Sequence, residues 1–141
     1  MQDSEAMAQL VSAYQLQGHL TSVEALQRSW SHFVEFLRAQ YGEPTALRHE
    51  LPFKQQVGKQ VITGSIDMVW ETAEGAVLID FKTYSGTTQQ LLDPNNPHYA
   101  GLYKGQLDCY QRAIEASGQK VLDQLIFYPI LGDVVRLLPL D

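Results

Sequence analysis

The stretch GSIDMVWETAEGAVLIDFKT, residues 64–83, decides the fold and holds the residues on which a function can be argued. Apolar and polar side chains alternate on both sides of residues 72–75, a run that favours a turn. This alternation predicts two antiparallel strands joined as a hairpin. If the turn centres on Ala73 and Glu74, residues that face each other have numbers that sum to 147.

This register separates the side chains of the hairpin into two kinds of face, because successive residues of a strand point to opposite sides. The first face is entirely apolar, with Ile66, Met68, Trp70, Val77, Ile79 and Phe81. The second face holds Ser65, Asp67, Val69, Leu78, Asp80 and Lys82. A slip of one residue would mix the two sets, so the pattern itself supports the register.

Asp67 and Asp80 face each other in this register, with β-carbons roughly 4.5–5.5 Å apart. Like charges at that spacing destabilise a sheet. A divalent cation would offset the repulsion, and oxygen ligands suit Mg²⁺ or Mn²⁺ better than zinc. Lys82 is on the same face, two residues from Asp80. The alternative is a solvated surface hairpin in which the two carboxylates and the lysine have no role.

The rest of the chain predicts an α/β fold with a mixed central sheet and helices on both faces, in the order α-α-β-β-β-α-β-β. The predicted helices cover residues 4–18, 21–42 and 97–118, and the predicted strands cover 47–53, 60–71, 76–83, 121–130 and 134–138. Pro52 indicates an edge strand or an early end of the strand, Asn96 and Pro97 start the last helix, and residues 84–97 form a loop. We expect one domain over residues 1–141, with a helical lead-in, 1–45, and a core, 46–141.

The composition of the chain excludes several kinds of site and several classes of protein. The chain has 141 residues, a formal net charge of −6 and a single cysteine, Cys109, which we expect to be a buried small apolar residue. One cysteine excludes an intramolecular disulfide and a cysteine-cluster zinc site. The acidic balance argues against a protein that coats nucleic acid, but it is compatible with an enzyme that holds cations. The absence of a long apolar run predicts a cytoplasmic protein with no membrane partner.

Five elements in order resemble the nuclease domain of the RecB/AddA family, a PD-(D/E)xK-type nuclease at the C-terminus of bacterial helicase–nucleases. They are Glu50-Leu-Pro-Phe53, Gly64-x-x-Asp67, Val77-Leu-Ile-Asp80, Asp80-Phe-Lys82-Thr83 and Gln106-x-x-x-Tyr110. The resemblance covers roughly residues 47–141. It implies a restriction-endonuclease-like core.

The resemblance also implies a function: a Mg²⁺-dependent DNA nuclease of the exodeoxyribonuclease V type, with Mn²⁺ as a substitute, that hydrolyses phosphodiester bonds in double-strand-break repair. It makes Asp67, Asp80 and the Phe81 carbonyl metal ligands and Lys82 the residue that acts on the attacking water. Gln106 and Tyr110 would support the site or contact DNA, with Glu50 as a brace or an indirect ligand. The implied partners are single-stranded DNA ends and a helicase domain in the same parent chain or a partner subunit.

Three alternatives remain open. Gln106 and Tyr110 lie on an apolar helical stripe, so core packing explains them as well as DNA contact does, and Glu50 can be structural. The family carries a histidine on an upstream helix, but His19 and His32 do not have that context, and with His98 they are expected in surface or packing positions. We therefore expect either a fragment that begins after that motif or a catalytically inactive nuclease-fold scaffold or DNA-end-binding module.

Overall fold

The computed structural model describes residues 23–84 and 86–140. The first predicted helix, residues 4–18, and His19 lie outside the described residues. In chain order the elements are α2 (Val23–Tyr41), β1 (Ala46–Val57), β2 (Gln60–Glu71), β3 (Ala76–Phe81), α3 (Thr88–Leu92), the 3₁₀-helix η1 (Ala100–Tyr103), α4 (Lys104–Ala116), β4 (Val121–Tyr128) and β5 (Asp133–Leu137).

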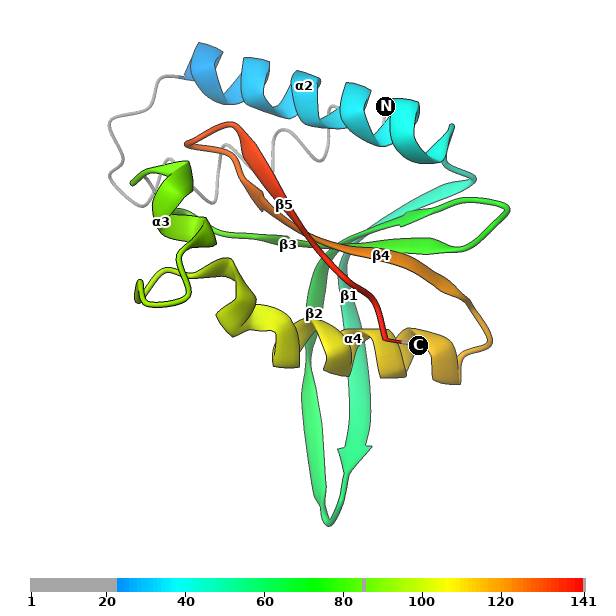
Figure 1. Cartoon of the computed structure of the whole chain (residues 1–141). Coiled ribbons are helices and arrows are strands. Elements are labelled where there is room, and N and C mark those ends of the chain that lie inside the picture. Colours follow the sequence, from blue (N-terminus) through cyan, green and yellow to red (C-terminus); the bar gives the residue numbers. More distant parts are fainter. Residues whose placement is uncertain (1–22, 85, 141) are drawn as a thin grey trace.

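The five strands form one mixed sheet in the order β1-β2-β3-β4-β5. The first three strands are antiparallel, β4 runs parallel to β3, and β5 is antiparallel to β4. The parallel step requires a crossover, which α4 provides. Helix α2 covers one face of the sheet and α4 the other (Figure 1). The predicted α/β fold with a mixed sheet is confirmed.

Helix α2 supplies one layer of the core. Its buried residues recur at steps of three and four, so they form one apolar stripe: Leu26, Trp30, Phe33, Val34 and Leu37. The Phe33 ring stacks on Phe127 of β4, with 4.0 Å between centroids. Ser29 Oγ donates to the Pro129 carbonyl oxygen at 2.7 Å. The helix is therefore packed into the same domain as the sheet.

The predicted register of the β2–β3 hairpin is confirmed. Val69 pairs with Leu78 and Trp70 pairs with Val77. The turn is closed by the Thr72 N–H, which donates to the Gly75 carbonyl at 2.8 Å. The regular pairing ends at Met68 and Ile79. Asp67 and Asp80 are therefore one step beyond the last paired position, and the expected ladder pair between them is not formed.

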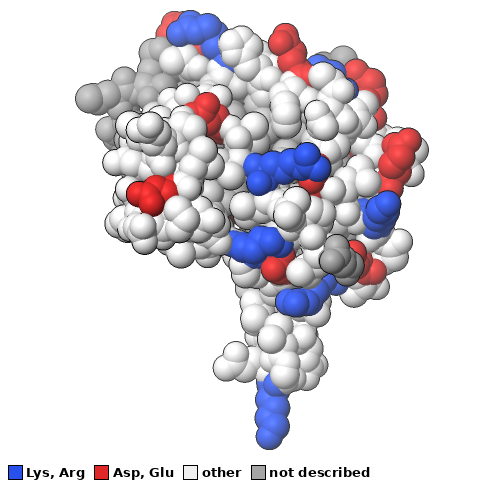
Figure 2. Space-filling view, in the orientation of Figure 1, with Lys and Arg blue, Asp and Glu red and all other residues white. Residues whose placement is uncertain are grey.

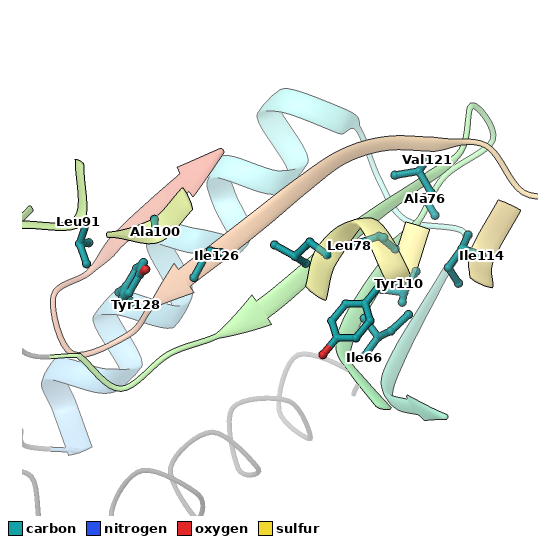
Figure 3. Packing of buried hydrophobic residues seen from close by; sticks show 12 residues of the cluster. Ile66, Ala76, Leu78, Leu91, Ala100, Tyr110, Ile114, Val121, Ile126 and Tyr128 are labelled. Atoms are coloured by element: carbon teal, nitrogen blue, oxygen red, sulfur yellow. The ribbon is translucent and has the colours of Figure 1, made fainter. Parts of the chain in front are cut away.

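The predicted side of Ile66 is wrong. Met68 packs under α2, whereas Ile66 joins the cluster under α4 with Tyr110 and Ile114 (Figure 3). The cause lies in β1, where Glu50 has a φ of +50° and stands between two regularly paired residues, opposite Asp67. This left-handed residue turns the strand pair, and the residues beyond it face α4.

Beyond this bend, the end of the β1–β2 hairpin projects from the body of the protein (Figure 1). Strand β1 continues past Pro52 to Val57, because it is an edge strand and a proline without an N–H can face outward there. Its early end at residue 53 was therefore a wrong prediction. The visible surface of the projection is mostly uncharged, with a basic side chain at its tip (Figure 2).

The predicted start of the last helix at Pro97 is also wrong. The Asn96 side chain accepts from the His98 N–H at 2.8 Å and so closes a local turn. The α-helix begins only at Lys104, after η1. Residues 84–97, expected as a loop, contain α3, whose capping box pairs Thr87 with Gln90. Strands β3 and β4 end at Phe81 and Tyr128, earlier than the sequence predicts.

Two further observations concern the cysteine and the character of the helices. Cys109 is buried in α4, as predicted for a small apolar side chain. Within residues 23–84 and 86–140, no helix has the length and apolar character needed to cross a membrane.

Candidate active site

Asp67 occupies the fork where β2 leaves β3. The last paired residues of the two strands are Met68 and Ile79. The main-chain N–H of Phe81 donates to Asp67 Oδ2 at 2.8 Å. A side-chain carboxylate thus replaces the main-chain acceptor that a continuing ladder would supply. This bond fixes the Asp67 carboxylate against the main chain that follows Asp80.

Asp80 is a buried carboxylate with an incomplete set of partners. It is 3% exposed and pairs with Ile126 of β4, so its side chain lies on the face that α4 covers. Its Oδ2 is 3.0 Å from Lys82 Nζ, an ion pair. This contact lacks hydrogen-bond geometry, and within the described residues Oδ2 has no hydrogen-bond partner. A buried polar atom in this state requires an explanation.

The electrostatics of Asp80 reflect this position. Burial is the main cause that raises its pKa, to about 6, the positive charge of Lys82 lowers it, and the negative charge of Asp67 raises it further. The charge of Asp67 therefore acts on Asp80, although the two residues lie beyond the last ladder pair. Ionising Asp80 therefore costs free energy even with Lys82 beside it, and a divalent cation at the pair would lower that cost.

Lys82 is held between an acid and an aromatic ring. Its Nζ is 3.0 Å from Asp80 Oδ2 and 4.2 Å from the centroid of the Tyr103 ring, a cation–π distance. The lysine side chain is 26% exposed. Its ammonium group is thus fixed beside the carboxylates while part of it stays open to solvent.

Gln106 and Tyr110 extend the site onto α4. Gln106 Nε2 donates to Tyr110 Oη at 2.7 Å. The Tyr110 ring is buried and meets Phe53 edge-to-face at 5.0 Å. Burial, followed by the charges of Asp80 and Asp67, raises the pKa of Tyr110 to about 12. Tyr110 is therefore a packed residue that senses both carboxylates, while Gln106 is exposed.

Glu50 stands apart from the acidic pair. It occupies the β1 position opposite Asp67, its φ of +50° is unusual for a residue other than glycine, and it is exposed. Among residues 23–84 and 86–140, no three or more His, Cys, Asp or Glu side chains cluster closely enough to hold a metal ion. The structure does not bring Glu50 to the pair as a third acidic ligand.

The residues present nevertheless fit a hard divalent cation. Mg²⁺ is commonly bound by one or two carboxylates, with water and substrate phosphate as the other ligands. The Oδ2 atom of Asp80, buried without a hydrogen bond, is a donor of the required kind next to a second carboxylate. The pair therefore suits Mg²⁺ or Mn²⁺, and it lacks the nitrogen and sulfur donors that zinc prefers.

Comparison with known families agrees with this geometry. The model of the PD-(D/E)XK nuclease superfamily matches residues 2–133, which is most of the chain. The matched range includes Asp67, Asp80 and Lys82. The chain belongs to the PD-(D/E)XK nuclease superfamily. The resemblance noted in the sequence is thereby confirmed at the level of the superfamily.

A curated relative matches part of the chain. The chain is 34% identical over 101 residues to an ATP-dependent helicase/nuclease subunit of Anoxybacillus flavithermus (strain DSM 21510 / WK1). The match covers 69% of this chain but 8% of that protein, so this superfamily member spans a small part of its relative. A solved structure described as "Crystal structure of SSO0001" has 15% identity and a TM-score of 0.41, covering 96% of this chain and 63% of that one.

Four residues around Lys82 were not singled out as functional by the sequence. They are Tyr84, His98, Tyr103 and Tyr128, which line a pocket beside the lysine. His98 is exposed, as expected, but its ring stacks on Tyr84. Tyr84 follows β3, His98 lies between α3 and η1, Tyr103 ends η1, and Tyr128 ends β4, so no spacing in the sequence connects them.

Proposed function

We propose that this domain is a metal-dependent deoxyribonuclease that hydrolyses phosphodiester bonds in DNA. One observation carries the proposal: a carboxylate oxygen of Asp80 is buried without a hydrogen bond, beside Asp67 and Lys82, in a member of a nuclease superfamily. A purely structural role does not explain why the Asp80 carboxylate is buried, since neutral or apolar side chains fill a core at a lower cost in free energy.

Asp67 and Asp80 would hold the cation, with the carbonyl oxygen of Phe81 as a third ligand. Phe81 is suitably placed for this, because its own N–H is bonded to Asp67. Mg²⁺, with Mn²⁺ as a substitute, would polarise the scissile phosphate and favour ionisation of water. The raised pKa of Asp80, which persists despite the ion pair with Lys82, supports this assignment.

Lys82 would act on the reacting groups directly. Its ammonium group is positioned by Asp80 and by the Tyr103 ring, so it needs little reorganisation to donate to water or to the phosphate. A fixed donor of this kind stabilises the negative charge that develops in the transition state. Gln106, exposed at the start of α4, would contact the DNA strand, and Tyr110 would hold Gln106 in place.

The relative named as a helicase/nuclease subunit supports a parent protein of that kind. We propose that the domain works in the cytoplasm on single-stranded DNA ends delivered by a helicase domain, in the same parent chain or in a partner subunit. Repair of double-strand breaks is the process that such an assembly would serve. Glu50 would act on the acidic pair only indirectly, as a brace of the β1–β2 strand pair at its bend.

We expect the protein to cleave a labelled single-stranded oligonucleotide in Mg²⁺ or Mn²⁺, to stop in excess EDTA and to resume when the metal is restored. Asp67→Asn should abolish cleavage, because it removes a ligand charge while keeping an acceptor for the Phe81 N–H. Glu35→Gln, an exposed acid on α2, is the matched control and should cleave normally.

Gel analysis of the products reports the outcome. DNA binding without cleavage in either metal would overturn the enzyme proposal and favour the inactive DNA-binding module. Equal cleavage by Asp67→Asn and the wild-type protein would show that the acidic pair is not the active site.

A further inference from the structure

A pocket of about 360 Å³ opens beside the acidic pair, within the range of roughly 300–1,000 Å³ for small-molecule sites. Its lining is mainly aromatic and hydroxylic: Lys82, Thr83, Tyr84, His98, Tyr103 and Tyr128. We call it the aromatic pocket. Among the described residues that line it there is no carboxylate, and the one lysine, Lys82, is already paired with Asp80. The lining therefore suits a flat, uncharged group better than a second phosphate.

The Tyr84 and His98 rings form a prepared stacking platform. Their centroids are 4.1 Å apart and their planes differ by 21°. The Tyr84 hydroxyl bonds Gln90 in α3 and so anchors its ring, whereas the main-chain N–H of His98 bonds the Asn96 side chain and fixes the backbone that carries the His98 ring. His98 is exposed, so the stack ends at solvent and another planar ring can extend it.

Tyr128 gives an independent sign of a ligand. The residue is 1% exposed, and its hydroxyl oxygen has no hydrogen-bond partner within the described residues. Burial raises the pKa of this hydroxyl, so it keeps its proton and can donate. It lies at the α3 end of the α4-side core, near Ala100 (Figure 3), and it also lines the aromatic pocket. A polar edge of a bound base would satisfy it.

Lys82 connects this pocket to the acidic pair. Its Nζ touches Asp80 on one side and the Tyr103 ring on the other. A nucleotide whose phosphate lies at the carboxylates therefore has its base next to the aromatic rings. A base in a duplex must first be unstacked and unpaired at a cost in free energy, so a single strand offers its bases to such a pocket more readily.

We propose that the aromatic pocket holds one unpaired nucleobase of the DNA strand that is cleaved at Asp67 and Asp80. This proposal rests on the proposed nuclease function, because that function brings the strand to the pair. It makes single-stranded DNA the preferred substrate and assigns Tyr84, His98, Tyr103 and Tyr128 to substrate binding. Stacking supplies affinity with little preference between bases.

Binding of fluorescein-labelled oligothymidylate, measured by anisotropy in the Asp80→Asn background to prevent cleavage, tests the pocket directly. We expect His98→Ala to weaken binding roughly 5- to 150-fold, the range for loss of one base–aromatic stack. His32→Ala, another exposed histidine, is on α2 on the opposite face of the sheet and should bind normally. Equal affinity of the His98→Ala and His32→Ala variants would overturn the proposal.

A second variant removes one hydroxyl and keeps the packing. Tyr128→Phe should weaken binding several-fold without lowering the melting temperature, because the lost hydroxyl makes no hydrogen bond within the described residues. An oligonucleotide with abasic sites separates base contacts from backbone contacts. It should bind the His32→Ala control more weakly than intact DNA, whereas His98→Ala should discriminate less between the two.

The two proposals can fail separately. If the wild-type protein cleaves in Mg²⁺ but His98→Ala and Tyr128→Phe bind DNA normally, the pocket proposal is wrong and the nuclease proposal stands. If the wild-type protein does not cleave but both variants lose affinity for intact DNA, the pocket binds a base and the nuclease proposal is wrong.

Discussion

The Asp80→Asn variant is expected to be more stable than the wild-type protein at pH 7 and to lose DNA cleavage. The pKa of Asp80 is raised to about 6 in spite of its ion pair with Lys82, so ionising this buried group at pH 7 costs the folded state about 1–3 kcal/mol. The amide removes the buried charge and its repulsion with Asp67. It also removes a ligand of the proposed cation, so we expect cleavage to fall by at least roughly 10³-fold, as for other groups that stabilise transition-state charge.

The matched control is Asp123→Asn in the neighbouring strand. Asp123 is 2% exposed, as buried as Asp80, but its carboxylate accepts from Tyr41 Oη at 2.6 Å and from Arg136 Nε at 2.8 Å. Removing this fully paired charge should lower the free energy of unfolding. Urea denaturation therefore gives opposite signs for the two variants, and a similar loss of stability in both would contradict the account.

The same comparison has a defined pH dependence. The pKa of Asp80 is about 6 in the folded protein against an ordinary 3.8. Between these values the folded chain keeps a proton that the unfolded chain has released, so this contribution to stability is lost as pH rises through about 6. Without metal, the advantage of Asp80→Asn over the wild-type protein should be small near about pH 4 and reach about 1–3 kcal/mol at pH 7.

Lys82→Ala is expected to lower kcat by roughly 10²–10³-fold while the acidic pair still binds Mn²⁺. The ammonium group is removed from its position between Asp80 and Tyr103, but both carboxylates remain. Lys104→Ala is the matched control: its Nζ pairs with Asp108 and lies 3.2 Å from Gln124 Oε1, with no contact to the acidic pair. Single-turnover cleavage at saturating DNA measures the effect.

A drop in rate of similar size in Lys104→Ala would show that a general loss of positive charge is responsible. If Lys82→Ala loses both Mn²⁺ binding and cleavage, the lysine acts on the acidic pair and not on the reacting groups.

The sequence predicts the centre of the sheet well and its distortions poorly. Val69–Leu78 and Trp70–Val77 pair as expected, because a strict alternation of apolar residues allows one register only. Ile66 changes sides because Glu50 adopts a left-handed backbone conformation, and a glutamate gives no sign of it. Glycine or asparagine would have been the usual signal.

The candidate site also has one part that the sequence predicts and another that it does not. The ion pair of Asp80 and Lys82 follows from the alternation of one strand, whereas Asp67 reaches the main chain after Asp80 from beyond the last paired position, which the alternation does not predict. The aromatic pocket requires the β3 end, the following segment, η1 and β4 to meet. The helix begins at Lys104 and not at the predicted Pro97, because Asn96 closes a local turn. The positions of His98 and Tyr103 depend on this difference.

Calorimetric titration of Mn²⁺ tests most directly the claim that Asp67 and Asp80 bind one cation together. The wild-type protein should show a saturable heat of binding, and Asp67→Asn and Asp80→Asn should each show none, while Asp123→Asn, measured where it is folded, should bind as the wild-type protein does. Equal heats in the wild-type protein and in Asp80→Asn would contradict the account.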